Sequence, residues 1–392
     1  MKNLLNKLEK LFPFESKAIL PLPPGMYQNN PEDSPHKMHL RLEADGSGVL
    51  IIDARTALHL NQTAAEFAYY LVHGASRETT LEQMESRYKV KSEQLADDYQ
   101  QLLDTIQTLS TTEDLDPEGF FFVDRTDPYS RNLSAPYRLD CALTYRQNDE
   151  AERNTTPEDR VKRELLTEEW QSILKKAWEA GIPHIVFTGG EPTLRPDLPE
   201  LVAFAEANGQ ITGLLTDGFR LCDPDYLHKM LETGLDHVMV TLDPKEDQSW
   251  EAVLDTLKED IFLTVHLTVM KKETDEYFSV MERLAKMGVR NLSLSGINAD
   301  LLEAVRKCGD FVTSRGISLV WDLPVPYSQF NPVSAELPSE QLRNGAGNAW
   351  LYLEPDGDVL PTQGVIKPLG NMLVDPWEKI WNNPLRKSDH ME

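Results

Sequence analysis

Cysteine is the scarcest chemically important residue in this 392-residue sequence, which contains only Cys141, Cys222 and Cys308. The three lie far apart and form no Cys-x-x-Cys or Cys-x-x-x-Cys pair. A disulfide framework uses paired cysteines, and a structural zinc or an iron–sulfur cluster uses thiolates at short, recognisable spacings. The pattern therefore argues against all three and predicts inert, buried thiols.

Long apolar runs and excess positive charge are also missing. No stretch approaches the ~20 apolar residues that cross a bilayer. The start, MKNLLNKLEKLFPF, interrupts its leucines with lysines and a glutamate, unlike a signal peptide. We therefore expect a cytoplasmic protein with no membrane partner. The 39 Lys and Arg residues against 64 Asp and Glu residues give a net charge of −25, which argues against a nucleic-acid binder.

Residues 37–112 read as a first folded unit, after an N-terminal segment, 1–36. MHLRL and GVLIID are strand patterns joined by a turn-rich tip. LNQTAAEFAYYLVHG, TTLEQMESRYKV and SEQLADDYQQLLDTIQTL are amphipathic helical patterns with N-cap residues. A hairpin followed by three helices predicts a winged-helix-like α+β domain. Residues 113–135, acidic and then rich in turn formers, read as a linker.

Strands and helices alternate six times over residues 136–330. Four of the helical patterns end in a glycine, as helix stops do: Gly181, Gly209, Gly234 and Gly288. Such alternation predicts an α/β fold with a parallel sheet, either an open sheet or a partial (β/α)6 TIM-like barrel. In residues 331–392, AWLYLEPDGDVLP reads as a hairpin and PWEKIWNN as a short helix. This tail is too small for its own core, so we expect it to pack on the barrel.

The stretch IVFTGGEP is the most informative strand end, because functional groups of parallel α/β folds lie at the carboxyl ends of the strands. Gly189 and Gly190 let the backbone approach a ligand closely, and Glu191 offers a carboxylate to an ammonium group. Pro192 starts the next element. A tight turn that requires glycine for packing explains the same residues, and the turn alone leaves both interpretations open.

The order LTYR, helix, GGEP, LTDG and VTLDP resembles the radical-SAM superfamily. The tail NGAGNAWLYLEPDGDVLPTQG resembles the SPASM extension of its peptide-modifying branch. LIIDARTALHLNQTAAEF resembles a PqqD-like peptide-recognition domain. The resemblance implies a radical-SAM partial barrel, preceded by the winged-helix-like domain and followed by a SPASM-like extension. It also implies that Gly189, Gly190, Glu191 and Pro192 hold the amino group of S-adenosylmethionine.

The sequence departs from this family at its metal ligands. The family uses CxxxCxxC after the first strand, because three thiolates hold a [4Fe–4S] cluster. Gln147, Ala151 and Asn154 occupy those positions here, and Asn344 and Thr362 replace auxiliary cysteines of the tail. Neutral amides and a methyl group are poor ligands for iron. We therefore expect no cluster and no other metal, while binding of S-adenosylmethionine stays open, although weakened.

The resemblance implies that a ribosomal leader peptide adds as a strand to an exposed sheet edge and packs against a helix. The candidate edge comprises Val49, Leu50, Ile51 and Ile52. Candidate groove residues are Tyr88, Leu95 and Tyr99. A domain core that these same residues close is the alternative interpretation.

Two functions are compatible with the sequence. The favoured one is a non-catalytic scaffold that binds a precursor peptide and supports its modification by an active partner enzyme. The partners expected beside the peptide are that enzyme or further copies of this chain in a homo-oligomer. The alternative is an enzyme with replaced, non-radical chemistry on a peptide. Its weak catalytic candidates at the barrel rim are Asp217, Asp243 and His266. Glu191 and Asp322 are further candidate groups at the same rim. A satisfied core histidine is the favoured interpretation of His266.

Overall fold

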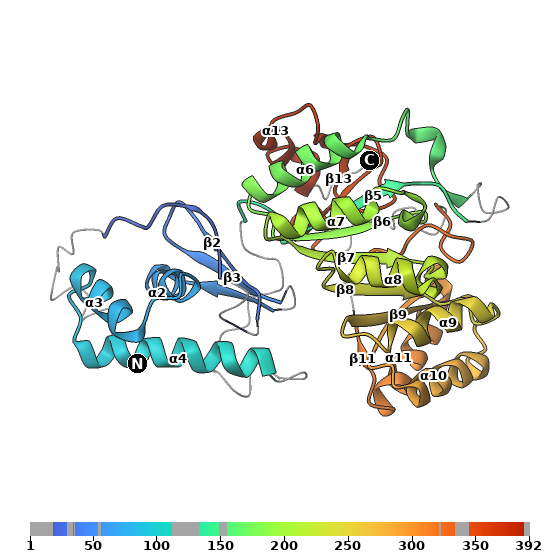
Figure 1. Ribbon diagram of the computed structural model, residues 1–392, viewed down its shortest axis with the longest axis horizontal. Coiled ribbons are helices and arrows are strands. Elements are labelled where there is room, and N and C mark those ends of the chain that lie inside the picture. The colour runs from blue at the N-terminus through green and yellow to red at the C-terminus, as the bar shows by residue number, and fades with distance from the viewer. Residues whose placement is uncertain are drawn as a thin grey trace. The chain divides into compact units, whose positions relative to one another are not determined.

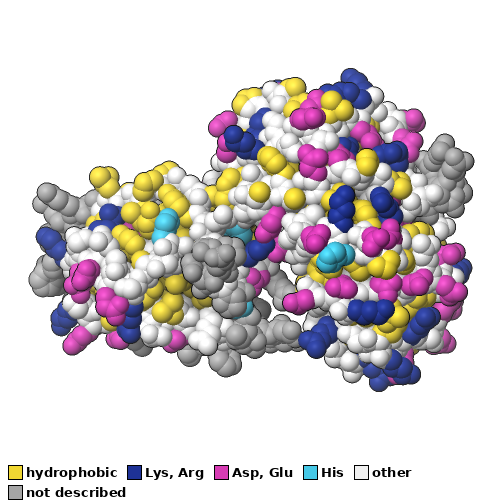
Figure 2. Space-filling view, viewed as in Figure 1, with side chains coloured by type: hydrophobic (Ala, Val, Ile, Leu, Met, Phe, Trp, Pro, Cys, Tyr) yellow, Lys and Arg dark blue, Asp and Glu magenta, His cyan; other side chains and the backbone are white. Residues whose placement is uncertain are grey.

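The structure, a computed structural model, describes residues 19–29, 34, 36–53, 56–111, 133–148, 155–320, 323–333 and 345–387. The chain divides into two compact units, within residues 1–125 and 126–392 (Figure 1). Hydrophobic side chains gather on the visible face of the first unit, and acidic and basic ones intersperse on that of the second (Figure 2). Among the described helices, none has the length and apolar character needed to span a membrane.

The N-terminal unit is a four-stranded antiparallel sheet followed by three helices. Its strands lie in the order β1 (Gly25–Gln28), β2 (Met38–Leu42), β3 (Gly48–Ile52) and β4 (Thr56–Leu60). The helices are α2 (Gln62–Val72), α3 (Arg77–Arg87) and α4 (Ser92–Thr111). The side chains of Asn61 and Ser76 cap the first two helices by accepting backbone hydrogen bonds. The three predicted helices are confirmed, but the predicted hairpin is part of a four-stranded sheet that begins at Gly25, ahead of residue 37.

The predicted edge strand is an internal strand. Residues Val49–Ile52 belong to β3, which pairs with β2 through Arg41↔Val49 and with β4 through Ile51↔Ala57. The prediction of an edge there was wrong, because the short segment TALHL forms one more strand immediately before helix α2. The outer strands of this sheet are β1 and β4.

The predicted groove residues largely serve the core of the N-terminal unit. Leu95 and Tyr99 on α4 are only 1% and 3% exposed, and the Tyr99 ring lies 5.2 Å from that of Phe67. They therefore close the core, as the alternative interpretation holds. Tyr88 ends helix α3 and is half-buried, and burial raises the pKa of its hydroxyl to about 12.

The second unit contains the predicted barrel of parallel strands. Its strands are β5 (Arg138–Thr144), β6 (His184–Gly189), β7 (Ile211–Thr216), β8 (His237–Thr241), β9 (Phe262–Val269) and β10 (Asn291–Gly296), each paired with the next. The helices between and after them are α6 (Thr167–Glu179), α7 (Leu198–Ala207), α8 (Pro224–Leu231), α9 (Asp247–Thr256), α10 (Asp275–Met287) and α11 (Leu302–Ser314). A short seventh strand, β11 (Ser318–Leu319), pairs with β10.

Alternation along the strands separates the main core from the inner face of the sheet. On β9, Val265 and Leu267 belong to the large core that the helices cover, so His266 between them faces the other side. The side chains of Val186, Leu215 and Met239 form a small separate cluster on that inner face. The inner face is therefore apolar near the middle of β6–β8 and polar on β9.

The C-terminal extension continues the barrel sheet. It comprises β12 (Trp350–Leu353), β13 (Asp358–Leu360), β14 (Gly370–Asn371) and α13 (Trp377–Trp381). Strand β12 pairs in parallel with β5, and β12 and β13 form the predicted hairpin. The Lys176 ammonium donates to the carbonyl of Met372 at 2.6 Å, and the Trp381 indole donates to that of Leu133 at 3.1 Å. These contacts hold the extension beside the first barrel strand.

Candidate functional site

The glycine turn after β6 packs directly on the backbone that follows β5. The Gly190 amide donates to the Thr144 carbonyl, and the Glu191 amide donates to the Arg146 carbonyl, both at 2.8 Å. A Cβ atom on Gly189 would lie 2.1 Å from the Thr144 oxygen, and one on Gly190 would lie 2.4 Å from the Arg146 oxygen. Gly189 also has a φ of +135°. Packing alone therefore requires both glycines.

Glu191 connects this turn to the end of β7. Its Oε1 accepts hydrogen bonds from the Thr193 amide at 2.9 Å, the Thr193 hydroxyl at 2.5 Å and the Thr216 hydroxyl at 2.8 Å. Its Oε2 accepts from the Asp217 amide at 2.8 Å. The side chain is 2% exposed, and Pro192 begins the short 3-10 helix η4 (Pro192–Leu194) behind it. The carboxylate is thus committed to protein donors and does not fit an exposed site for a ligand's ammonium group.

Asp217 is the less buried partner of Glu191. It is half-buried, and its Oδ2 accepts a hydrogen bond from the Asn148 side-chain amide at 2.6 Å. Burial and the neighbouring Asp217 carboxylate raise the pKa of Glu191 to about 8, and burial raises the pKa of Asp217. Two neighbouring carboxyl groups whose pKa values are both raised favour the protonated forms more than ordinary carboxyl groups do, as a general acid–base pair requires.

Asp243, the other carboxylate candidate at the barrel rim, has its own hydrogen-bonding partners among the described residues. The Asp243 carboxylate accepts a hydrogen bond from the Lys245 amide at 2.9 Å, and the Asp243 amide donates to the Ser249 hydroxyl at 3.0 Å. Asp243 therefore closes the turn that leads into α9. The carboxyl group that interacts with Asp217 is that of Glu191, which follows the glycine turn. The sequence had indicated a different role for Glu191, the binding of a ligand's ammonium group.

His266 lies buried on the inner face of β9 among hydroxyl groups. Its Nδ1 lies 3.0 Å from the Ser293 hydroxyl, and its Nε2 lies 3.1 Å from that of Ser295 and 3.2 Å from that of Thr268. Both ring nitrogens thus have hydrogen-bonding partners, as expected for a satisfied core histidine. Asp322, the remaining weak candidate, lies outside the described residues.

The cysteines do not supply the ligands of an iron–sulfur cluster. Cys141 is buried on β5 within the helix-covered core, and Cys308 is buried on α11 in the same core. Cys222 ends the 3-10 helix η5 (Phe219–Cys222), where its thiol donates to the Gln248 carbonyl at 3.3 Å. Among the described residues, no group of three potential metal ligands includes any of these thiols.

The substituted ligand positions do not supply ligands either. Gln147 presents a neutral amide, and the Thr362 hydroxyl lies 3.5 Å from the Trp350 indole nitrogen. Ala151, Asn154 and Asn344 lie outside the described residues. Within the described part of the chain, one group of three carboxylates could approach a metal, on the β12–β13 hairpin: Glu354, Asp356 and Asp358. The Arg160 guanidinium already pairs with the first of these at 2.8 Å. The residues present therefore do not fit a [4Fe–4S] cluster.

Comparison with known proteins agrees with this fold. Residues 141–302 match the Radical SAM superfamily. A PqqA peptide cyclase from Streptomyces rochei is 27% identical over 286 residues, covering 64% of this chain and 76% of the relative. An Fe-coproporphyrin III synthase from Methanosarcina barkeri is 37% identical over 112 residues, covering 29% of this chain and 26% of the relative. The second match is thus local, spanning about a quarter of that enzyme.

The solved structure of Streptococcus suis SuiB bound to S-adenosylmethionine superposes with a TM-score of 0.58 at 16% identity, covering 89% of this chain and 88% of SuiB. SuiB bound to its precursor peptide SuiA superposes with a TM-score of 0.57 at 14% identity, covering 88% of both chains. At these identities the likeness establishes the fold: a radical-SAM partial barrel with an N-terminal antiparallel sheet domain and a C-terminal extension.

Residues 141–302, which include most of the barrel, are thus similar to the Radical SAM superfamily. Among the relatives, the peptide cyclase is by name a peptide-modifying enzyme. These relatives are enzymes, so the comparisons give no support to a non-catalytic role.

Proposed function

We propose that this protein binds a precursor peptide with its N-terminal unit and hydrolyses an amide bond of the peptide at the barrel rim, with water as the second reactant and general acid–base catalysis in place of an iron–sulfur cluster. The observation that carries the proposal is the carboxyl pair of Glu191 and Asp217. It combines a fully buried carboxyl group with a half-buried one that Asn148 holds at 2.6 Å. Asp217 reaches the substrate and exchanges the proton, and Glu191 stabilises either protonation state of its neighbour.

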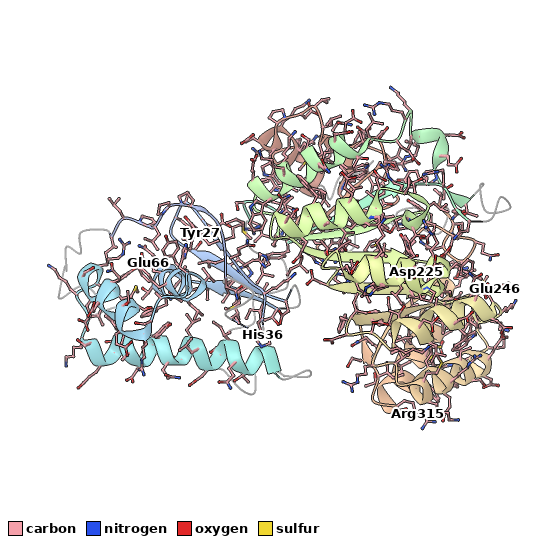
Figure 3. The ribbon with its side chains drawn as sticks, in the orientation of Figure 1. Tyr27, His36, Glu66, Asp225, Glu246 and Arg315 are labelled. Atoms are coloured by element: carbon pink, nitrogen blue, oxygen red, sulfur yellow. The ribbon has the colours of Figure 1, made fainter. Side chains whose placement is uncertain are left out.

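The peptide adds to the outer edge of β4. The two outer strands differ in what they offer an added strand. Strand β4 has five residues and no glycine or proline, whereas β1 has four residues and follows Pro23 and Pro24, which cannot donate a backbone hydrogen bond. Tyr27 on β1 is further engaged by a ring contact with Tyr69 at 4.9 Å; Figure 3 labels Tyr27 on this strand.

Two comparisons support a peptide as the substrate. The S. rochei relative is by name a cyclase of a peptide, and SuiB has been solved with its precursor peptide bound. Both make a peptide the expected substrate of this chain. The replaced ligand positions support chemistry of another kind than that of the superfamily, because radical generation from S-adenosylmethionine depends on the cluster.

A scaffold without catalytic activity is the second candidate. Its favouring observation is the poor fit of the donor set to a cluster, which removes the superfamily's own chemistry. In this case the bound peptide would leave with an unchanged mass unless a partner enzyme, or a second copy of the chain, acted on it. The two candidates therefore differ in a directly measurable product.

Incubating the purified protein with the short peptides encoded beside its gene, followed by mass spectrometry, tests the proposal. We expect a mass change with the wild-type protein and with Asp243→Asn, and none with Asp217→Asn. Peptide affinity, measured by calorimetry, should be equal in all three. Binding without any mass change would favour the scaffold, and absence of binding would contradict both functions. Adding S-adenosylmethionine to the same reactions shows whether it participates.

A further inference from the structure

The segment Leu323–Asn331, here called the rim strap, crosses the carboxyl end of the barrel next to the glycine turn. The Tyr327 amide donates to the Gly189 carbonyl at 2.9 Å, and the Tyr327 ring meets that of Tyr145 edge-on at 5.5 Å. Leu323 packs on the apolar cluster of the inner face. The strap thus covers the glycine turn that the family resemblance assigns to the amino group of S-adenosylmethionine.

Gln147 ties this strap to the loop after β5. Its side-chain amide donates to the Tyr327 carbonyl at 2.5 Å. Its Oε1 accepts a hydrogen bond from the Thr155 hydroxyl at 3.0 Å. The Gln147 side chain therefore donates one hydrogen bond to the rim strap and accepts another from Thr155. These two hydrogen bonds are here called the Gln147 tie. Thr155 follows directly after Asn154, the last of the three substituted ligand positions.

The neighbours of Gln147 each contact a different part of the same rim. Tyr145 packs on the strap, the Arg146 carbonyl holds the Glu191 amide at 2.8 Å, and Asn148 holds the Asp217 carboxylate at 2.6 Å. A displacement of Gln147 would consequently move the groups that position the carboxyl pair. Residues 145–148 therefore connect the rim strap, the glycine turn and Asp217.

We propose that Gln147 is a positioning residue that replaces a metal cross-link with a protein one. In the superfamily, a cluster bound at this position joins the two ends of the loop. Here the Gln147 amide joins Gln147 to Thr155 and adds a third attachment, the rim strap. A neutral amide suits this task because it presents one donor and one acceptor group in fixed directions. The tie would act in a catalytic protein and in a scaffold alike, so it goes beyond the proposed function.

The tie also closes the glycine turn to small ligands. The Gly189 carbonyl accepts from the strap, and the amides of Gly190 and Glu191 donate to the loop after β5. A ligand with an ammonium group would need to displace the Tyr327 amide to reach this carbonyl. Release of the strap should therefore increase any affinity for S-adenosylmethionine instead of reducing it.

Three substitutions separate the two ends of the tie. Gln147→Glu keeps an acceptor for Thr155 but loses the donor to Tyr327, so it should release the strap alone. Thr155→Val should release the loop alone, and Gln147→Ala should release both. Gln171→Ala is the control, because the side-chain amide of Gln171 on α6 donates to the Glu200 carboxylate on α7 at the surface, at 2.9 Å.

Hydrogen–deuterium exchange of the full chain, followed by mass spectrometry, measures both ends at once. In Gln147→Glu we expect about tenfold faster exchange in peptides covering residues 323–331, the effect of losing one buried hydrogen bond. In Thr155→Val the faster exchange should be confined to residues 155–160. The control should match the wild-type protein. Unchanged exchange in the strap of Gln147→Glu, or equal acceleration over the whole barrel, would overturn the proposal.

A ligand-binding readout separates positioning from simple stabilisation. Calorimetry with S-adenosylmethionine should give weaker binding to the wild-type protein than to Gln147→Glu. A merely structural role of Gln147 would make the variant bind no better. If Gln147→Ala fails to fold, the two single-ended variants still decide the outcome.

Discussion

The side-chain amide of Asn148 donates a hydrogen bond to the Asp217 carboxylate at 2.6 Å, joining the loop after β5 to the end of β7. Asp217 in turn donates its backbone amide to Glu191 at 2.8 Å. These two hydrogen bonds connect the ends of the consecutive strands β5, β6 and β7 through the carboxyl groups of Glu191 and Asp217. Separate predictions follow for the pH dependence of this carboxyl pair, for the packing of the glycine turn, and for the N-terminal unit with its proposed peptide-binding strand β4.

Stability should fall as the pH rises through the range in which Glu191 ionises. Its pKa is about 8 in the folded protein and 4.5 ordinarily, so the folded state holds a proton that the unfolded state has lost between these values. The stabilising effect is complete below the ordinary pKa and is lost as the pH approaches 8. Asp217→Asn removes the neighbouring charge and should flatten this dependence. Thermal unfolding midpoints from pH 4 to 9 measure it; a dependence that is the same in both proteins would contradict the assignment.

Gly190→Ala should destabilise the barrel severely. The new Cβ would lie 2.4 Å from the Arg146 oxygen and 2.8 Å from the Tyr145 oxygen, both backbone atoms that cannot turn away. We expect a loss of more than about 3 kcal/mol in the free energy of unfolding, measured with denaturant. Gly309→Ala within α11 is the control and should change stability by no more than about 1 kcal/mol. Equal effects of the two substitutions would remove the packing argument for the turn.

The ion pair of Glu66 and Arg87 should be essential to the N-terminal unit. Glu66 is 1% exposed and accepts two guanidinium hydrogen bonds, at 2.6 and 2.8 Å. Arg87→Met leaves this carboxylate buried without its partner, which should cost about 3–5 kcal/mol. Lys175→Met, which breaks the exposed pair with Glu179, should leave the unfolding midpoint unchanged. An unaffected N-terminal unit in Arg87→Met would show that the pair is not buried in solution.

Peptide binding should depend on β4 and not on β1. Ala57→Asp places a charge on an exposed position of β4, and Gln28→Asp does the same on β1. We expect the first to weaken binding of the precursor peptide at least tenfold and the second to leave it unchanged. On adding peptide, backbone exchange should slow in residues 56–60. Slowing in residues 25–28 instead would assign the peptide to the opposite edge.

The barrel could be predicted from the sequence because its signal is repeated. Strand patterns such as HIVFTGG and helix stops such as Gly209 and Gly288 recur at each unit, so an error in one leaves the others intact. The N-terminal sheet was harder, since β1 (GMYQ) and β4 (TALHL) lack the apolar run that marks β3 (GVLII). The edge was misplaced for that reason: Val49–Ile52 is the most apolar run, and such a run marks an internal strand.

The site was predicted in part. Asp217 was named from its place at a strand end, which parallel topology predicts. Its partnership with Glu191 was missed, because it depends on a backbone hydrogen bond between adjacent strands. The tie through Gln147 was not foreseeable either, since Tyr327 lies 180 residues further along the chain. Spacing along a sequence does not encode such a contact.

Anaerobic reconstitution with iron and sulfide tests the central claim, that the barrel works without a cluster, most directly. We predict iron and sulfide contents near zero per chain, no absorbance typical of a [4Fe–4S] centre, and no release of 5′-deoxyadenosine from S-adenosylmethionine under reducing conditions. Incorporation of about four irons and four sulfides per chain, together with that cleavage, would contradict the account.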